Sequence, residues 1–104
     1  MTPAGEDLAR EYCLNLAAKL ARIEELRAAL AGGAAPPASV GDLLRDLHSI
    51  AGSAQVFGLP AVGDAARAAE LYAAEHCSAR PGAAQWTELR ALLEKLQLLF
   101  ERRA

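Results

Sequence analysis

Cysteine and histidine are scarce in this sequence, which limits the chemistry that it can perform. Two residues of each type occur among the 104. A structural zinc site needs about four such ligands at close spacing, and only His76 and Cys77 are adjacent. We therefore expect no metal site and no cofactor held by the chain itself. We also expect Cys13 and Cys77 to be small buried residues without a redox role.

Long apolar runs are also absent. No stretch reaches the ~18 consecutive apolar residues that a membrane-spanning helix needs. The segment from Met1 to Asp7 lacks the basic and apolar regions of a signal peptide. These absences predict a cytoplasmic protein without membrane insertion, and the initial methionine favours a free-standing chain.

An excess of positive charge and a nucleotide-binding loop are missing as well. The formal net charge is −2, which gives nucleic-acid binding no electrostatic support. No Gly-x-x-x-x-Gly-Lys-Ser/Thr loop and no other glycine-rich phosphate-binding stretch occurs. We therefore expect that the chain neither binds ATP nor acts as a kinase by itself.

What the sequence does contain predicts helices. Aromatic residues make up 5% of the chain and β-branched residues are few, whereas alanine and leucine are abundant. The length suits one domain, residues 1–104, with a single core. Short connections between the helices predict an all-α, antiparallel up-down-up-down four-helix bundle. The expected helices cover residues 6–31, 39–58, 59–76 and 83–102.

Helix-terminating signals support these limits. Gly32-Gly33 ends the first helix, and Ser39 is a suitable N-cap for the second, with Asp42 three residues later. Gly58 is expected to end the second helix in a left-handed conformation, and Pro60 suits the first turn of the third.

The apolar residues recur with helical spacing. In the first helix they form one face with Leu8, Tyr12, Leu16, Leu20, Ile23, Leu26 and Leu30. In the third helix the buried face consists of small side chains, and we expect the charged residues to form a solvated face of Asp64, Arg67, Glu70 and Glu75.

One histidine lies at the margin of the apolar face of the second helix. With Leu47 at the centre of that face, His48 falls at about 100° on the helical period, just outside the apolar stripe. Arg45, Gly52 and Gln55 share this edge. A glycine inside a helix costs about 0.5–1 kcal/mol relative to alanine, so Gly52 suggests that His48 requires open space beside it.

The residues around His48 resemble the signature of histidine phosphotransfer (HPt) domains. The resemblance covers His48-Ser49-Ile50-Ala51-Gly52-Ser53-Ala54, then Gly58, Val62, Ala66, Ala69 and Glu70. The sequence departs from the family pattern at Ala51, where a lysine is usual, and at Ala69, where a larger apolar residue is usual.

The resemblance implies a phosphocarrier in a two-component phosphorelay. His48 would take a phosphoryl group on Nε2 from the aspartyl phosphate of one receiver domain and pass it to another. The receiver would supply Mg²⁺ and the acidic residues. Response-regulator receivers and a hybrid or sensor histidine kinase are the implied partners of a monomer.

Roles for the flanking residues follow from their positions. Gly52 leaves clearance for the partner, while Arg45 and Gln55 contact phosphate oxygens. Ala51 adjoins the site without the usual charge, and we expect Arg45 to replace that lysine in part.

Two other functions stay open. The missing lysine at Ala51 is compatible with a receiver-docking module of HPt fold that transfers no phosphate. A metal- or haem-binding helical bundle is the other alternative, but Arg45 stands where the usual Glu-x-x-His motif has glutamate.

Overall fold

Helices account for almost all of the chain that the structure describes. The structure is a computed structural model, and it describes residues 3–31, 39–77 and 81–102. Its helices are α1 (Pro3–Ala31), α2 (Ser39–Ser53), α3 (Pro60–His76) and α4 (Ala83–Glu101). No strand occurs within these three ranges, so the expected all-α class is confirmed.

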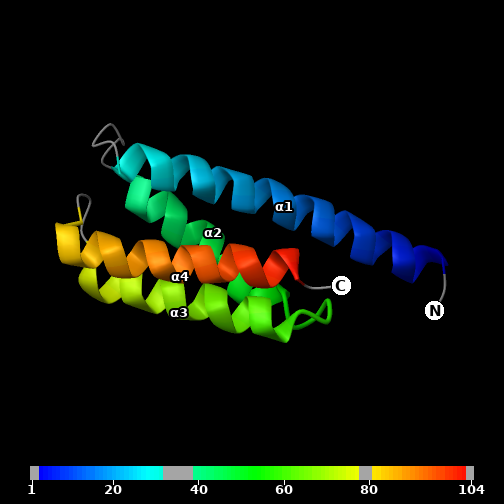
Figure 1. Cartoon of the computed structure of the whole chain (residues 1–104). Helices are drawn as coiled ribbons and strands as arrows, with labels where there is room; N and C mark the ends of the chain where they lie inside the picture. The colour runs from blue at the N-terminus through cyan, green and yellow to red at the C-terminus, as the bar shows by residue number, and fades with distance from the viewer. Residues whose placement is uncertain (1–2, 32–38, 78–80, 103–104) are drawn as a thin grey trace.

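The helices lie alongside one another around one core. In Figure 1 successive helices run in opposite directions. The closest packing joins α2 to α3 and α3 to α4, while α1 lies against α2 and α4. Each helix therefore has two neighbours, and α2 is flanked by α1 and α3.

Each helix contributes one apolar stripe to the core, as the helical spacing predicts. On α2, Leu43, Leu47 and Ile50 are completely buried. The face of α3 towards the core carries mostly small side chains, which allow close approach of neighbouring helices. The other buried residues include Leu16, Leu20, Ile23, Leu89, Leu93, Leu96 and Phe100.

The first turns of α1 differ from the sequence prediction. Leu8, expected on the buried face, is 60% exposed. The reason is visible in Figure 1, where the N-terminal part of α1 extends past the ends of the other helices and has no partner there to cover it. Leu30 and the Gly32-Gly33 stop lie outside the residues whose side chains or backbone are described.

The second helix ends earlier than expected. Regular α-helix stops at Ser53 instead of Gly58, because the backbone bonds that follow span three residues: Val56 N–H donates to the Ser53 carbonyl at 3.1 Å, and Gly58 N–H to that of Gln55 at 3.1 Å. Gly58 itself has a φ of +79°, which confirms the predicted left-handed glycine. Pro60 then begins α3, also as predicted.

Candidate functional site

His48 stands on the side of the bundle, between two residues of the core stripe of α2. Leu47 and Ile50 are fully buried, whereas the imidazole of His48 is 76% exposed. The expected position at the margin of the apolar face is therefore what the fold produces. An imidazole anchored on a packed helix, with most of its surface in solvent, is accessible to another macromolecule.

A carboxylate from α3 holds the imidazole. The Nδ1 atom of His48 lies 2.7 Å from Oε2 of Glu70. A carboxylate only accepts hydrogen bonds, so Nδ1 carries the proton and donates it to Glu70. In the neutral ring the lone pair then resides on Nε2, which makes no hydrogen bond to any described residue. The contact thus fixes one tautomer and presents Nε2 as the nucleophilic atom.

The position of Glu70 corrects the sequence interpretation. Glu70 was expected on the solvated face of the third helix, yet its side chain is only 18% exposed. It lies one turn after the buried Ala66 and one turn before the buried Ala73, at the edge of the small-residue face. The only sequence signal for a role of Glu70 was its place at the end of the HPt-like pattern. Its charge alone predicts exposure to solvent.

Small residues bring α3 close to α2 near this pair. Gly63 is buried, and a Cβ placed on it would lie 3.4 Å from Cβ of Ala54 and 3.6 Å from the carbonyl oxygen of Ala51. The third neighbour is Cγ of Gln55, at 3.5 Å. The small residues at Gly63, Ala51 and Ala54 let α3 lie close against α2, and Glu70, two turns further along α3, reaches His48.

The predicted flanking residues do not all border the imidazole equally. Gly52, one turn after His48, is exposed, and a Cβ placed on it would meet no atom within 4 Å. Ala51 is only 5% exposed, so its methyl group offers little surface to a phosphate or a partner. Gln55 lies beyond the end of α2, beside Gly63.

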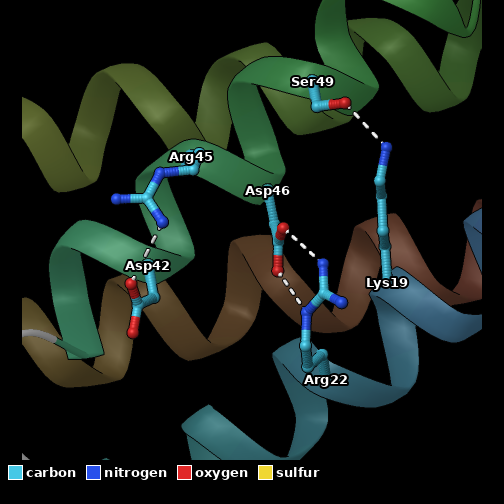
Figure 2. A network of polar contacts seen from close by, with 6 residues as sticks. All are labelled: Lys19, Arg22, Asp42, Arg45, Asp46 and Ser49. Carbon is cyan, nitrogen blue, oxygen red and sulfur yellow. Dashed lines mark hydrogen bonds and ion pairs between the residues drawn. The ribbon is translucent and has the colours of Figure 1, made fainter.

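Arg45 is directed away from His48. Its Nη1 lies 3.5 Å from Oδ1 of Asp42, one turn earlier on the same helix (Figure 2). Arg45 also borders the groove between α1 and α2, together with Arg22 and Asp46. The structure therefore places Arg45 towards α1, whereas His48 contacts α3.

Polar side chains join α1 to α2 on that opposite side. Figure 2 shows Arg22 of α1 reaching Asp46, with Nη2–Oδ1 at 2.7 Å and Nε–Oδ2 at 3.1 Å, and Lys19 donating to Oγ of Ser49 at 2.7 Å. The hydrogen bond to Asp46 raises the pKa of Arg22 above its ordinary value. A third polar contact between α1 and α2 joins Oγ of Ser53 to the hydroxyl of Tyr12 at 2.8 Å. Ser49 and Ser53 therefore bind side chains of α1.

The second histidine belongs to a different environment. His76 ends α3, where its Nε2 lies 3.7 Å from a carboxylate oxygen of Glu75 and its ring packs on Tyr72. Burial raises the pKa of the neighbouring Cys77 thiol, which disfavours the reactive thiolate. Within the described ranges, no three His, Cys, Asp or Glu side chains gather as metal ligands would. None of the helices described is long and apolar enough to cross a membrane.

Comparison with known proteins adds one finding. A family model described as Hpt domain matches residues 7–99, which include all of α2 and α3 and therefore both His48 and Glu70. No curated protein and no solved structure matches the chain significantly.

Proposed function

Because this chain belongs to the Hpt domain family, we propose that it is a phosphocarrier that relays a phosphoryl group between aspartates of receiver domains through His48. Family membership implies phosphotransfer in two-component signalling, and Hpt domains interact in general with receivers and kinases. The observation that carries the specific proposal is the 2.7 Å contact between Nδ1 of His48 and Glu70, which in the neutral ring leaves the lone pair on the exposed Nε2.

The proposed reaction is an in-line displacement at phosphorus. The lone pair of His48 Nε2 attacks the phosphorus of an aspartyl phosphate, and a P–N bond forms. The P–O bond to the receiver's aspartate breaks, and its electron pair stays on that carboxylate. In the onward step, the carboxylate of a second receiver attacks the same phosphorus, and the P–N electron pair returns to Nε2. No proton has to be added or removed at Nε2.

Glu70 acts here as a positioning residue. When Nε2 attacks, the imidazole acquires positive charge while Nδ1 keeps its proton. The carboxylate of Glu70, held 2.7 Å from Nδ1, stabilises that charge and keeps the ring oriented. The carboxylate side of this contact is largely shielded, at 18% exposure, while the imidazole side faces solvent.

In this proposal, the residues that flank His48 mainly let the receiver reach the imidazole and take little part in the reaction itself. Open space at Gly52 lets the receiver's active site approach Nε2. Gln55 borders the same α2–α3 face, where its amide contacts the partner or phosphate oxygens. Arg45 would have to leave Asp42 to reach a phosphoryl group on His48.

The remaining parts of the machinery come from the partner. We expect the receiver to bring the Mg²⁺ ion and its acidic ligands, and a separate histidine kinase to supply the phosphoryl group. The proposal further includes an up-down-up-down bundle, supported by the alternating helix directions in Figure 1, and a monomeric, cytoplasmic carrier.

Replacement of His48 tests the proposal directly. Phosphorylated receivers carrying labelled phosphate are mixed with the parent protein, with His48→Gln and with His76→Gln. We expect the parent and His76→Gln to take up label that is acid-labile and base-stable, as a P–N bond should be. We expect no label on His48→Gln, whose circular dichroism should match that of the parent because the side chain is exposed.

Two results would contradict phosphotransfer through His48. One is undiminished labelling of His48→Gln, or label located on His76. The other is a parent protein that binds phosphorylated receivers but takes up no label, which would identify a receiver-docking module instead.

A further inference from the structure

The residues described so far place no free positive charge beside a phosphoryl group on His48. A phosphoryl group carries about two negative charges, and on Nε2 it would stand near the carboxylate of Glu70. Ala51, one turn after His48, carries no charge, and Arg45 is engaged by Asp42 on the side facing α1. A cation from another element would offset the negative charge of a phosphoryl group here.

The register of α3 identifies where such a cation could come from. Gly63 packs beside Ala51 and Gln55, and Glu70 contacts His48. Arg67 lies between them, one turn after Gly63 and one turn before Glu70. On an ideal helix its side chain projects roughly 40° to the solvent side of Gly63, so it stands at the outer rim of the α2–α3 contact. Its exposed position agrees with this geometry.

Arg67 is also available to bind an anion. Each of the other arginines named so far has a carboxylate partner: Arg22 pairs with Asp46 and Arg45 with Asp42. Arg67 makes no hydrogen bond or ion pair with any residue that the structure describes. The vacant space over Gly52 adjoins the same rim of α2. Among the described residues, no carboxylate contact has to be broken before its guanidinium turns towards Nε2.

We propose that Arg67 binds the phosphoryl oxygens on His48 from the facing helix. This inference rests on the phosphocarrier function proposed above and assigns a second residue to the same site. The guanidinium donates charge-assisted hydrogen bonds to two of the phosphoryl oxygens, a geometry for which its planar fork is suited. Glu70 then stabilises the ring while Arg67 stabilises the group that the ring carries, and both come from successive turns of α3.

A small phosphodonor separates this role from receiver docking. Parent protein, Arg67→Gln, Arg67→Lys and the matched control Arg45→Gln are phosphorylated with phosphoramidate, and the phosphohistidine signal is followed by ³¹P NMR. Loss of charge-assisted hydrogen bonds should slow labelling of Arg67→Gln about tenfold and shift its ³¹P resonance. Arg67→Lys should keep part of the rate, because the charge remains without the fork. Arg45→Gln should match the parent.

The outcomes distinguish the two proposals. If the parent protein is labelled on His48 and Arg67→Gln is labelled at the same rate with the same resonance, the Arg67 assignment is wrong while the phosphocarrier function stands. Equal slowing of Arg45→Gln and Arg67→Gln overturns the assignment too, because it indicates a general charge effect. If the parent takes up no label from phosphoramidate or from any receiver, the phosphocarrier function itself fails. Thermal melts of all four proteins establish that each is folded.

Discussion

The two sides of α2 are held to their neighbours by different means. Towards α3, the contact consists of small residues, among them Gly63, Ala51 and Ala54. Towards α1, long polar side chains span the gap, as in the pairs of Arg22 with Asp46 and of Lys19 with Ser49. The imidazole of His48 makes its contact on the close-packed side.

This difference indicates where the fold needs positional accuracy. A contact between small residues allows a narrow range of spacing, because interiors are close-packed and a large added side chain forces the helices apart. A long ion pair tolerates shifts of its backbones, since its rotatable bonds can compensate. The hydrogen bond from His48 to Glu70 needs the first kind of contact, and orientation of α1 needs only the second.

Replacement of Gly63 with leucine should have the largest effect, because it disturbs the close contact between α2 and α3. The new side chain would extend into Ala54 and the Ala51 carbonyl, so we expect Gly63→Leu to lose about 1–3 kcal/mol of unfolding free energy. The separated helices should also draw Glu70 away from His48 and slow phosphotransfer. Urea unfolding and receiver-to-His48 transfer rates measure the two effects.

Gly63→Ala is the matched control. Its Cβ would make a 3.4 Å contact with Ala54, which is ordinary packing, so stability and transfer should stay near those of the parent. Unchanged stability and transfer in Gly63→Leu would show that the α2–α3 spacing is not tight.

Loss of a polar pair on the other side should have a smaller effect. The carboxylate of Asp46 is 12% exposed and accepts two hydrogen bonds from Arg22. Asp46→Asn keeps the shape but removes the charge, so we expect a lower urea midpoint than the parent's, a decrease smaller than that of Gly63→Leu. Transfer by Asp46→Asn should be unaffected, because His48 does not contact this side.

Asp42→Asn serves as the control for that variant. Its 3.5 Å contact with Arg45 is solvent-exposed, and such pairs contribute little, so its midpoint should equal the parent's. A transfer defect in Asp46→Asn without one in Asp42→Asn would mean that the α1 side also positions the imidazole.

The exposed glycine should give the smallest change in stability. No atom would contact a Cβ at Gly52, so Gly52→Ala should raise the unfolding free energy by about 0.5–1 kcal/mol through helix propensity alone. Gly52→Gln should fold at least as stably as the parent yet transfer phosphoryl groups far more slowly, because its side chain would stand beside His48.

Thermal melts and transfer kinetics on the two variants test the clearance role of Gly52. Normal transfer by a well-folded Gly52→Gln would rule it out. On this hypothesis the two glycines differ in role: Gly52 would keep a partner's path open, whereas Gly63 lies in the contact between α2 and α3.

The sequence specified the fold in detail wherever spacing carried the information. The stripe containing Leu43, Leu47 and Ile50 is buried as its periodicity predicts. The position of His48 at the edge of that stripe follows from the same helical period. Periodicity failed for Leu8, because a face is buried only where another helix reaches it. The end of α2 was misplaced because the shift to three-residue hydrogen bonds after Ser53 has no marker in the residue types.

The candidate site was predicted only in part. His48 and the open space at Gly52 were identified from a single helix. Glu70 was missed because its role depends on which residue of another helix faces it, and spacing along one helix does not contain that information. Arg45 was expected near His48 because residues three apart on a helix have neighbouring side chains. In the structure, the side chain of Arg45 turns to Asp42 instead.

The hydrogen bond to Glu70 also bears on which phosphohistidine isomer the proposed phosphocarrier would form. The outer torsion of a histidine side chain has two broad minima, and an exposed imidazole would visit both, presenting Nδ1 and Nε2 to the solvent in turn. Glu70 removes that choice by retaining Nδ1 at 2.7 Å. In the proposed phosphocarrier, phosphorylation would therefore give only the Nε2 regioisomer, and every receiver that docks would meet the same leaving group.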